Sequence, residues 1–263
     1  MCLLLLVPLT RFFAFQGWLR PVRIAGSSMA DGFYGPHYLV RCKDCGFAFR
    51  CGWDLVPSGR VVVCPNCGFP DNDLDKATME FGRRVVIDRW MCWMRNLRCW
   101  QPVAFVADQV PESPAVKRLV AGAGSRLEIR DGDVFVDGQI QRKTLDQFQQ
   151  VAILVHDDRY RPSYTPGLPD RWQGRRSDSR WRATSSGYEC SARAVDTTLT
   201  VDWLDYIQWT CWPNPSPPRA RTAPTEILDH YGYSQDVSRS ALNRVGDILL
   251  QCELAVNGAG HVA

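Results

Sequence analysis

The chain is poor in histidine, in long apolar runs and in net charge. Its four histidines (His37, His156, His230 and His261) fit no signature of a histidine-based catalytic triad. Because a membrane-spanning helix needs roughly 20 apolar residues, the N-terminal run is too short, being interrupted at Pro8 and Arg11. The net charge of +3 is too small to indicate a nucleic-acid partner, and none is expected.

What the chain does have is enough apolar sequence for a folded core. It has 263 residues, of which 45% are hydrophobic, so it can form one large or two ordinary domains. Eight of its ten tryptophans lie in residues 90–100 and 172–212, a pattern that fits a β-rich protein near a membrane.

Two dipeptides carry the strongest indication of catalysis: Ser28-Met29 and Lys117-Arg118. A serine hydroxyl is a weak nucleophile and needs a base beside it, and a lysine whose amine is neutral at a buried site can be that base. The alternative interpretation of Lys117-Arg118 is a solvated basic pair at the end of a strand. The residues around the two dipeptides favour the catalytic interpretation.

Residues 11–29, 82–90 and 115–140 give those dipeptides a context. They read as an apolar stretch leading to Ser-Met, a Val/Ile-rich strand opened by glycine, and a Lys-Arg box running into a glycine turn and a hairpin. In this order they resemble the bacterial type I signal peptidases over roughly residues 10–143.

The resemblance implies a mainly β fold, a signal-peptidase-like antiparallel β domain, with Ser28 as nucleophile and Lys117 as general base. It implies a membrane-associated serine endopeptidase, with its catalytic domain on the extracytoplasmic side of the cell membrane. Its partners would be membrane lipid and secretory precursors bearing signal peptides. The backbone N–H of Ser28 would help to form an oxyanion hole, since Gly26 stands where the family often has a hydroxyl residue.

The sequence departs from the family in three of its boxes. Residues 30–32 replace the usual residues after Ser-Met, and 121–125 replace a Gly-Leu-Pro-Gly run. The late box that completes the family's site has its nearest match at 174–180, which lacks Asp-Asn and reads as a chance match in a polar loop. The site is therefore expected to be incomplete in this chain.

Five cysteines lie within 26 residues, four of them in two Cys-x-x-Cys-Gly motifs (Cys42, Cys45, Cys64 and Cys67). The glycine permits a positive-φ turn that frees backbone N–H groups to face thiolates. Four thiolates at this spacing predict a structural Zn²⁺ in a zinc ribbon, with no open position for catalysis. The alternative is two short disulfides, Cys42–Cys45 and Cys64–Cys67, which an extracytoplasmic location would favour. Cys51 is left over as a buried, inert thiol.

We expect four regions along the chain. Residues 1–20 are an apolar segment, read as a remnant membrane anchor, with a signal peptide or a buried strand as alternatives. Residues 21–40 and 71–150 form the catalytic domain, residues 41–70 the zinc-ribbon insertion, and residues 151–263 a Trp-rich β region, an incomplete insert domain.

Strands are expected at 59–63, 82–89, 103–106, 197–201 and 202–209, and a hairpin at 127–138 with an Asp-Gly turn. Residues 247–256 also read as a strand, followed by the hairpin signal Asn257-Gly258. Because no returning strand follows, we expect a truncated form of a longer protein.

Three functions compete on these observations. The first is the signal-peptidase-type enzyme. The second is a non-enzymatic zinc-ribbon binding module on a degenerate peptidase scaffold. The third is a secreted carbohydrate- or protein-binding β domain, which the tryptophans permit.

Overall fold

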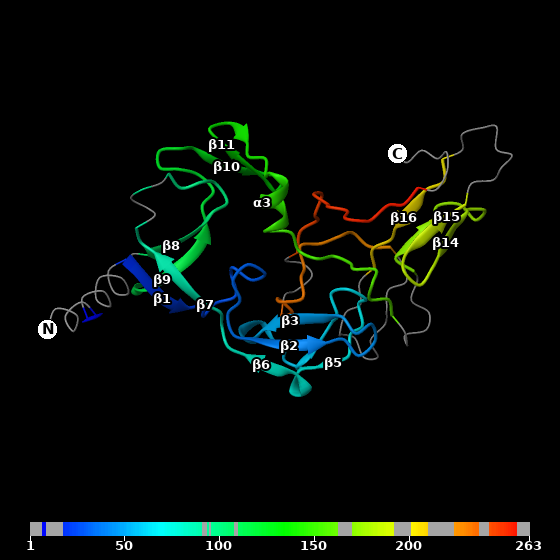
Figure 1. The fold of residues 1–263 in the computed structure, drawn as a ribbon, viewed down its shortest axis with the longest axis horizontal. Helices are drawn as coiled ribbons and strands as arrows, with labels where there is room; N and C mark the ends of the chain where they lie inside the picture. The colour runs from blue at the N-terminus through cyan, green and yellow to red at the C-terminus, as the bar shows by residue number, and fades with distance from the viewer. Residues whose placement is uncertain are drawn as a thin grey trace. The chain divides into compact units, whose positions relative to one another are not determined.

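The protein is described by a computed structural model covering residues 7–8, 18–90, 94, 96–107, 110–162, 170–191, 201–209, 224–236 and 242–256. It is mainly β, with 31% of its residues in strands and 8% in helices. The strands form small antiparallel sheets (Figure 1), as the alternating apolar segments predict. Most of the expected N-terminal segment, all but one residue of 197–201 and the Asn257-Gly258 pair lie outside the described residues.

The chain divides into two compact units. Unit 1 comprises residues 1–37 and 79–152, and unit 2 comprises residues 38–78 and 153–263. The cysteine ribbon and the Trp-rich second half therefore belong to the same unit, although residues 79–152 of unit 1 separate them along the chain.

Unit 1 is built from two antiparallel strand pairs and one hairpin sheet. Strand β1 (Leu19–Arg23) pairs with β7 (Arg84–Asp88), and β8 (Pro102–Ala107) pairs with β9 (Val110–Arg118). The expected strands at 82–89 and 103–106 are thereby confirmed.

The expected hairpin is also confirmed, as β10 (Leu127–Arg130) and β11 (Asp133–Val136). Asp131 and Gly132 both have positive φ, 52° and 89°, which is the backbone of a two-residue turn matched to strand twist. A second Asp-Gly pair at 137–138 turns the chain again into β12 (Gln139–Ile140), which completes a three-stranded sheet.

A short helix, α3 (Leu145–Gln149), ends unit 1. Thr144 accepts a hydrogen bond from the Gln147 N–H, and the Gln147 side chain accepts one from the Thr144 N–H. This reciprocal capping box satisfies two backbone donors that a helix start would otherwise leave without partners.

The first part of unit 2 is the ribbon, and its sheet has the order β3-β2-β6. Its strands are β2 (His37–Arg41), β3 (Ala48–Gly52) and β6 (Thr78–Glu80), with a second small pair of β4 (Val61–Val62) and β5 (Asn72–Asp73). Two single-turn 3₁₀ helices, η2 (Trp53–Leu55) and η3 (Leu74–Lys76), join these strands. The strand expected at 59–63 is thus present in shorter form.

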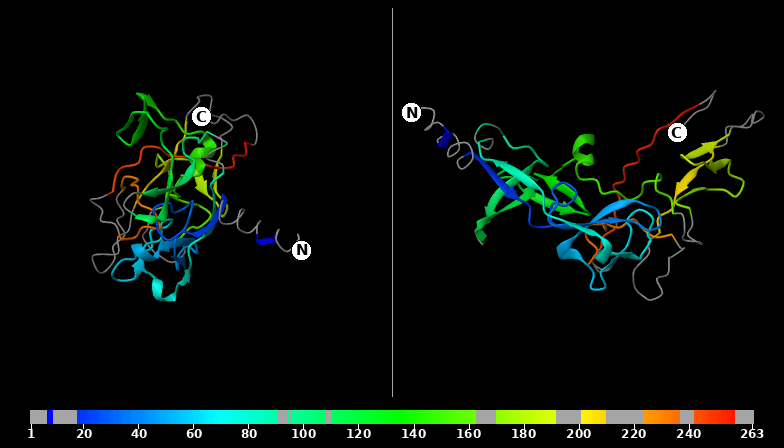
Figure 2. Two further views of the ribbon diagram at one scale, coloured as in Figure 1. Left: turned by 90° about the vertical axis from the view of Figure 1, so that its left-hand side faces the viewer. Right: turned by 60° about the horizontal axis from the view of Figure 1, so that its bottom comes forward.

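In the described residues of the second part of unit 2, the strands are three residues long. They are β13 (Trp172–Gly174) paired with β16 (Leu204–Tyr206), and β14 (Trp181–Ala183) paired with β15 (Tyr188–Cys190). Within residues 224–236, orange in Figure 2, backbone hydrogen bonds join Tyr233 and Asp236 to Gly52 and Leu55 of the ribbon.

The strand expected at 247–256 is wrong, because these residues form no strand in the structure. Their apolar side chains are exposed, for example Ile248 and Leu250 at 63% and 64%. A period-2 or apolar run identifies a strand only when a neighbouring strand is there to pair with it, and the described residues supply none.

Candidate metal centre and serine–lysine pair

The two Cys-x-x-Cys-Gly motifs fold into matching knuckles. In the first, the Cys42 N–H donates to the Phe47 carbonyl (2.8 Å) and the Gly46 N–H to the Cys42 carbonyl (3.1 Å). The second repeats both bonds one for one, at Cys64, Phe69 and Gly68, each 2.9 Å long. The two glycines have φ of 74° and 79°, so each occupies the left-handed conformation that the motif predicts.

The four thiols of these knuckles converge on one point. Cys42 Sγ lies 3.6 Å from Cys67 Sγ, Cys45 Sγ lies 3.7 Å from Cys64 Sγ, and all four sulfurs lie within 4.8 Å of one another. Four sulfurs held about 2.3 Å from a tetrahedral Zn²⁺ would lie about 3.8 Å apart. All four cysteines are free thiols, and the close pairs join the two knuckles, so the cluster could hold a metal ion.

Contacts among the four sulfurs shift their pKa values in opposite directions, lowering those of Cys42 and Cys45 and raising those of Cys64 and Cys67. Hydrogen bonds from Cys45, Cys64 and Cys67 lower the pKa of Cys42, and the Phe69 N–H donates to Cys67 Sγ at 3.4 Å. N–H donors aimed at metal-binding sulfurs are the outer-shell contacts that orient such ligands.

Asn72 ties the two knuckles together from inside the ribbon. Its side chain is 1% exposed. It accepts a hydrogen bond from the Lys43 N–H (3.1 Å) of the first knuckle and donates one to the Phe69 carbonyl (3.0 Å) of the second. One buried amide thus fixes the distance between the two pairs of thiols.

Cys51 is the buried, unreactive thiol that the sequence predicts. It is 0% exposed and packs in the same apolar cluster as Val40, Phe49 and Leu74. Burial, with Asp54 nearby, raises the pKa of the Cys51 thiol to about 12, so the thiolate does not form at neutral pH.

Ser28 and Lys117 both belong to unit 1. Ser28 lies in a turn after β1, where the Ala30 N–H donates to the Ser27 carbonyl (2.9 Å). Lys117 lies in β9, opposite Val103 of β8. Both side chains are exposed, and neither makes a side-chain hydrogen bond or ion pair in the part of the chain that the structure describes.

The loop that carries Ser28 is closed at its base by backbone contacts that only glycine allows. The Ile24 N–H donates to the Arg83 carbonyl (3.0 Å), and the Arg83 N–H donates to the Tyr34 carbonyl (2.8 Å). A Cβ at Gly82 would lie 1.9 Å from the Ile24 carbonyl oxygen, and one at Gly35 would lie 2.7 Å from that of Gly26. The glycine that opens the predicted strand is thus required by close backbone packing.

Arg118 connects this loop with the strand that carries Lys117. Its guanidinium donates to the Trp100 carbonyl and to the Gln150 carbonyl, each at 3.0 Å. A Cβ built at Gly32 would lie 3.4 Å from the same guanidinium, so the serine loop lies against the residue that follows Lys117. The contact joins the segments that carry the two motifs through Arg118, and because successive side chains of a strand point to opposite faces, the pairing of Ser28 with Lys117 stays a prediction.

The nearest match to the late box, residues 174–180, lies in unit 2 and forms a local turn. Asp202 holds it by accepting hydrogen bonds from Ser179 Oγ (2.9 Å) and the Arg180 N–H (2.7 Å). Arg176 and Asp178 form an ion pair within the turn. These contacts account for the polar residues of the segment without a catalytic role.

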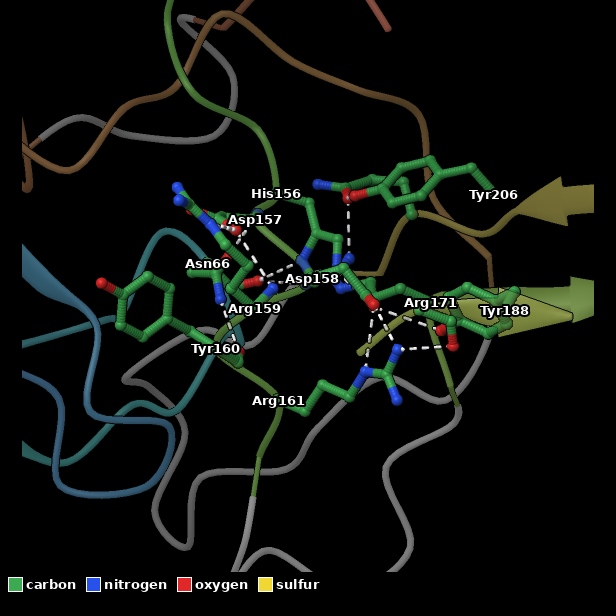
Figure 3. A network of polar contacts seen from close by, with 12 residues as sticks. Asn66, His156, Asp157, Asp158, Arg159, Tyr160, Arg161, Arg171, Tyr188 and Tyr206 are labelled. Carbon is green, nitrogen blue, oxygen red and sulfur yellow. Dashed lines mark hydrogen bonds and ion pairs between the residues drawn. The ribbon is translucent and has the colours of Figure 1, made fainter. Parts of the chain in front are cut away.

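Sequence reasoning missed the residues that attach the rest of unit 2 to the ribbon. Asn66, between the two cysteines of the second knuckle, is 0% exposed and bonds to residues 157 and 160 (Figure 3). The only sequence signal for this attachment was the asparagine itself, which stands between two candidate metal ligands but is not a metal ligand.

Comparison with protein-family models, with curated proteins and with solved structures found no match. Among the described residues, no helix has the length and apolar character needed to span a membrane.

Proposed function

We propose that this protein is a membrane-associated serine endopeptidase of the signal-peptidase type, which removes signal peptides from secretory precursors. Ser28 is its nucleophile and Lys117 its general base. The observation that carries the proposal is the packing of the serine loop, at Gly32, against Arg118, the neighbour of Lys117. The segments that carry these two motifs, 89 residues apart in the chain, therefore contact each other in unit 1.

In the first half of the reaction, Ser28 Oγ attacks the scissile carbonyl carbon while the Lys117 amine accepts the hydroxyl proton. The backbone N–H of Ser28 donates to the oxyanion that develops. Collapse of the tetrahedral intermediate breaks the C–N bond, and Lys117 returns its proton to the leaving amine. Water, deprotonated by the same amine, then hydrolyses the acyl-enzyme on Ser28.

Exposure of Lys117 gives the precursor a second role in this proposal. A lysine acts as a base when its amine is neutral, and burial favours that form of a lysine. An extended precursor lying across the Ser28 loop and β9 would cover the amine and exclude water from it. Membrane lipid and an extracytoplasmic position of unit 1 belong to the same proposal.

The ribbon has a separate role, as a structural zinc site of Cys42, Cys45, Cys64 and Cys67. The fit rests on the spacing of the four sulfurs and on the Phe69 N–H donor. Bound Zn²⁺ would supply folding free energy, and four thiolates leave no coordination position for a substrate.

The test is cleavage of a precursor with an Ala-x-Ala site in detergent. Ser28→Ala and Lys117→Ala should each reduce cleavage at least about 1,000-fold. Lys117→Arg should be as inactive as the alanine variant, because it keeps the charge but cannot accept a proton. Ser27→Ala is the matched control and should retain activity.

A second candidate is an inactive scaffold in which the ribbon is the functional module. It is favoured by the exposure of Ser28 and Lys117 and by the convergence of the four thiols. Wild-type protein that is folded and metal-loaded but cleaves no precursor would support this candidate over the first.

A further inference from the structure

The second part of unit 2 buries two large aromatic side chains against the ribbon. Of its described residues, the buried hydrophobic ones are Trp209 and Tyr233, at 1% and 2% exposure. A Cβ at Gly68 would lie 2.6 Å from the Trp209 ring, and one at Gly52 would lie 2.5 Å from the Tyr233 ring. Both rings therefore lie directly on ribbon backbone, one of them on the second metal knuckle.

Asn66 fastens residues 156–160 to the same knuckle (Figure 3). Its Nδ2 donates to the Tyr160 carbonyl (2.8 Å), and its Oδ1 accepts the Asp157 N–H. Nδ1 of His156 lies 3.4 Å from the Asn66 carbonyl oxygen, and burial lowers the pKa of His156, so the ring is neutral at pH 7. The Asn66 side chain thus satisfies two main-chain groups of residues 157–160.

Arg171 extends this attachment to Trp209. Its guanidinium donates to the Trp209 carbonyl (2.9 Å) and to Gln208 Oε1 (2.7 Å), and lies 3.9 Å from the centre of the Trp209 ring. It also donates to the Asn66 carbonyl at 3.4 Å. Arg171 is 6% exposed, and a buried cation is costly unless such contacts are all in place.

A second attachment joins residues 233–236 to the ribbon. The Gln235 side chain accepts the Val63 N–H and donates to the Val63 carbonyl, both at 3.1 Å, as a paired strand would. The Gly52 N–H donates to the Tyr233 carbonyl (2.9 Å), and the Asp236 N–H to the Leu55 carbonyl (3.1 Å). Val63 directly precedes the metal-facing Cys64.

We propose that metal occupancy of the four-thiol site controls the order of the segments seated on the ribbon, residues 156–161, 204–209 and 232–236, with Asn66 as the positioning residue that transmits it to residues 156–161. The contacts that hold these segments use backbone of the second knuckle and its flanks. A four-cysteine ribbon depends on its metal for folding, so release of the metal removes the surface on which Trp209, Tyr233 and residues 156–160 are seated. The inference rests on metal binding by the thiols and is independent of peptidase activity.

Amide hydrogen exchange of the full chain, loaded with Zn²⁺ and then treated with a chelator, tests the proposal. Chelation should lower protection about 100-fold or more in residues 38–78 and equally in 156–161, 204–209 and 232–236. Protection in the β10–β12 sheet of unit 1 should not change. Retained protection at 156–161 and 232–236 after chelation would overturn the proposal.

Two buried asparagines of the ribbon provide a matched pair of variants. Asn72→Ala removes the amide that joins the knuckles. It should therefore weaken Zn²⁺ binding and lower the protection from hydrogen exchange in both parts of unit 2. Asn66→Ala should keep one Zn²⁺ per chain and the protection of residues 38–78, while residues 156–161 lose theirs. Asn66→Asp keeps the acceptor for Asp157 and should give an intermediate loss.

The pair also distinguishes this role from a general structural one. If Asn66→Ala lowered Zn²⁺ affinity as much as Asn72→Ala does, Asn66 would be part of the metal site itself and the proposed relay would be wrong. If Asn66→Ala changed neither metal content nor exchange, the attachment at residues 156–160 would be independent of it, and the proposal would again fail.

Discussion

Unit 1 and the ribbon of unit 2 are built from the same short antiparallel strands but are stabilised differently. Of the hydrophobic residues that the structure describes in unit 1, Ile24 alone is buried, and Val86, Val106 and Ile129 are 60%, 58% and 70% exposed. The ribbon instead buries a continuous cluster: Val40, Cys42, Phe49, Cys51, Val62, Cys64, Cys67 and Leu74.

The difference teaches what each region relies on. Unit 1 is held by strand pairing, by tight turns and by glycines that allow close backbone approach, and its apolar strand faces are left exposed in the isolated chain. The ribbon's buried cluster includes three of the four candidate metal ligands, and structural Zn²⁺ contributes about 10–16 kcal/mol in zinc-finger peptides. We therefore expect unit 1 to respond to backbone substitutions and unit 2 to respond to the metal and its knuckles.

The largest effect of a single substitution is expected in unit 1, from Gly82→Ala. The new Cβ would lie 1.9 Å from the Ile24 carbonyl oxygen, so the pairing that closes the Ser28 loop must open. We expect a loss of about 4 kcal/mol in the free energy of unfolding of unit 1, measured by chemical denaturation. In Gly122→Ala the new Cβ meets nothing within 4 Å, and that control should change stability by less than about 0.5 kcal/mol. Equal effects of the two variants would contradict the packing at Gly82.

A smaller effect is expected in unit 2, where the two knuckle glycines form a matched pair. Gly46→Ala places alanine at φ of 74° in open space and should cost about 1 kcal/mol. Gly68→Ala has the same backbone cost and also a clash with the Trp209 ring at 2.6 Å, so it should cost about 3 kcal/mol. Thermal unfolding of Zn²⁺-saturated protein, followed by tryptophan fluorescence, measures both. Identical midpoints would show that Trp209 does not lie on the knuckle in solution.

The smallest effect is a pH dependence that belongs to unit 2. The pKa of Cys51 is raised to about 12 in the folded state, so this thiol contributes no pH dependence below its ordinary pKa near 9. As the pH rises from 9 towards 12, the unfolded chain loses this proton first, and stability falls by about 1 kcal/mol at pH 9.5. Urea unfolding at pH 7.5 and 9.5 should show this fall in the wild type and not in Cys51→Ala. An equal fall in both proteins would assign it to other groups.

Local patterns in the sequence predicted local structure well. The Cys-x-x-Cys-Gly motifs fixed both knuckles because the glycine conformation and the ring of hydrogen bonds involve residues within five positions of one another. Asp131-Gly132 predicted its hairpin for the same reason. The strand expected at 247–256 failed, since its apolar pattern says nothing of whether a partner strand exists.

The candidate site was predicted in part. The four thiols converge as the spacing indicates. Ser28 and Lys117 were identified by resemblance, and the structure adds the contact of Gly32 with Arg118 and the reason for Gly82. Both contacts join segments that are far apart in the sequence, and no local pattern predicts that they meet.

The sequence by itself therefore determined the knuckles, the Asp-Gly turns and the β character, because backbone conformation and metal-ligand spacing are properties of a few consecutive residues. Only the tertiary structure decided that Asn66 binds residues 157 and 160, that Trp209 covers Gly68, and that Gln235 pairs with Val63 across 172 positions. Such contacts depend on which buried polar group meets which backbone group once distant segments have packed, and no local pattern encodes that choice.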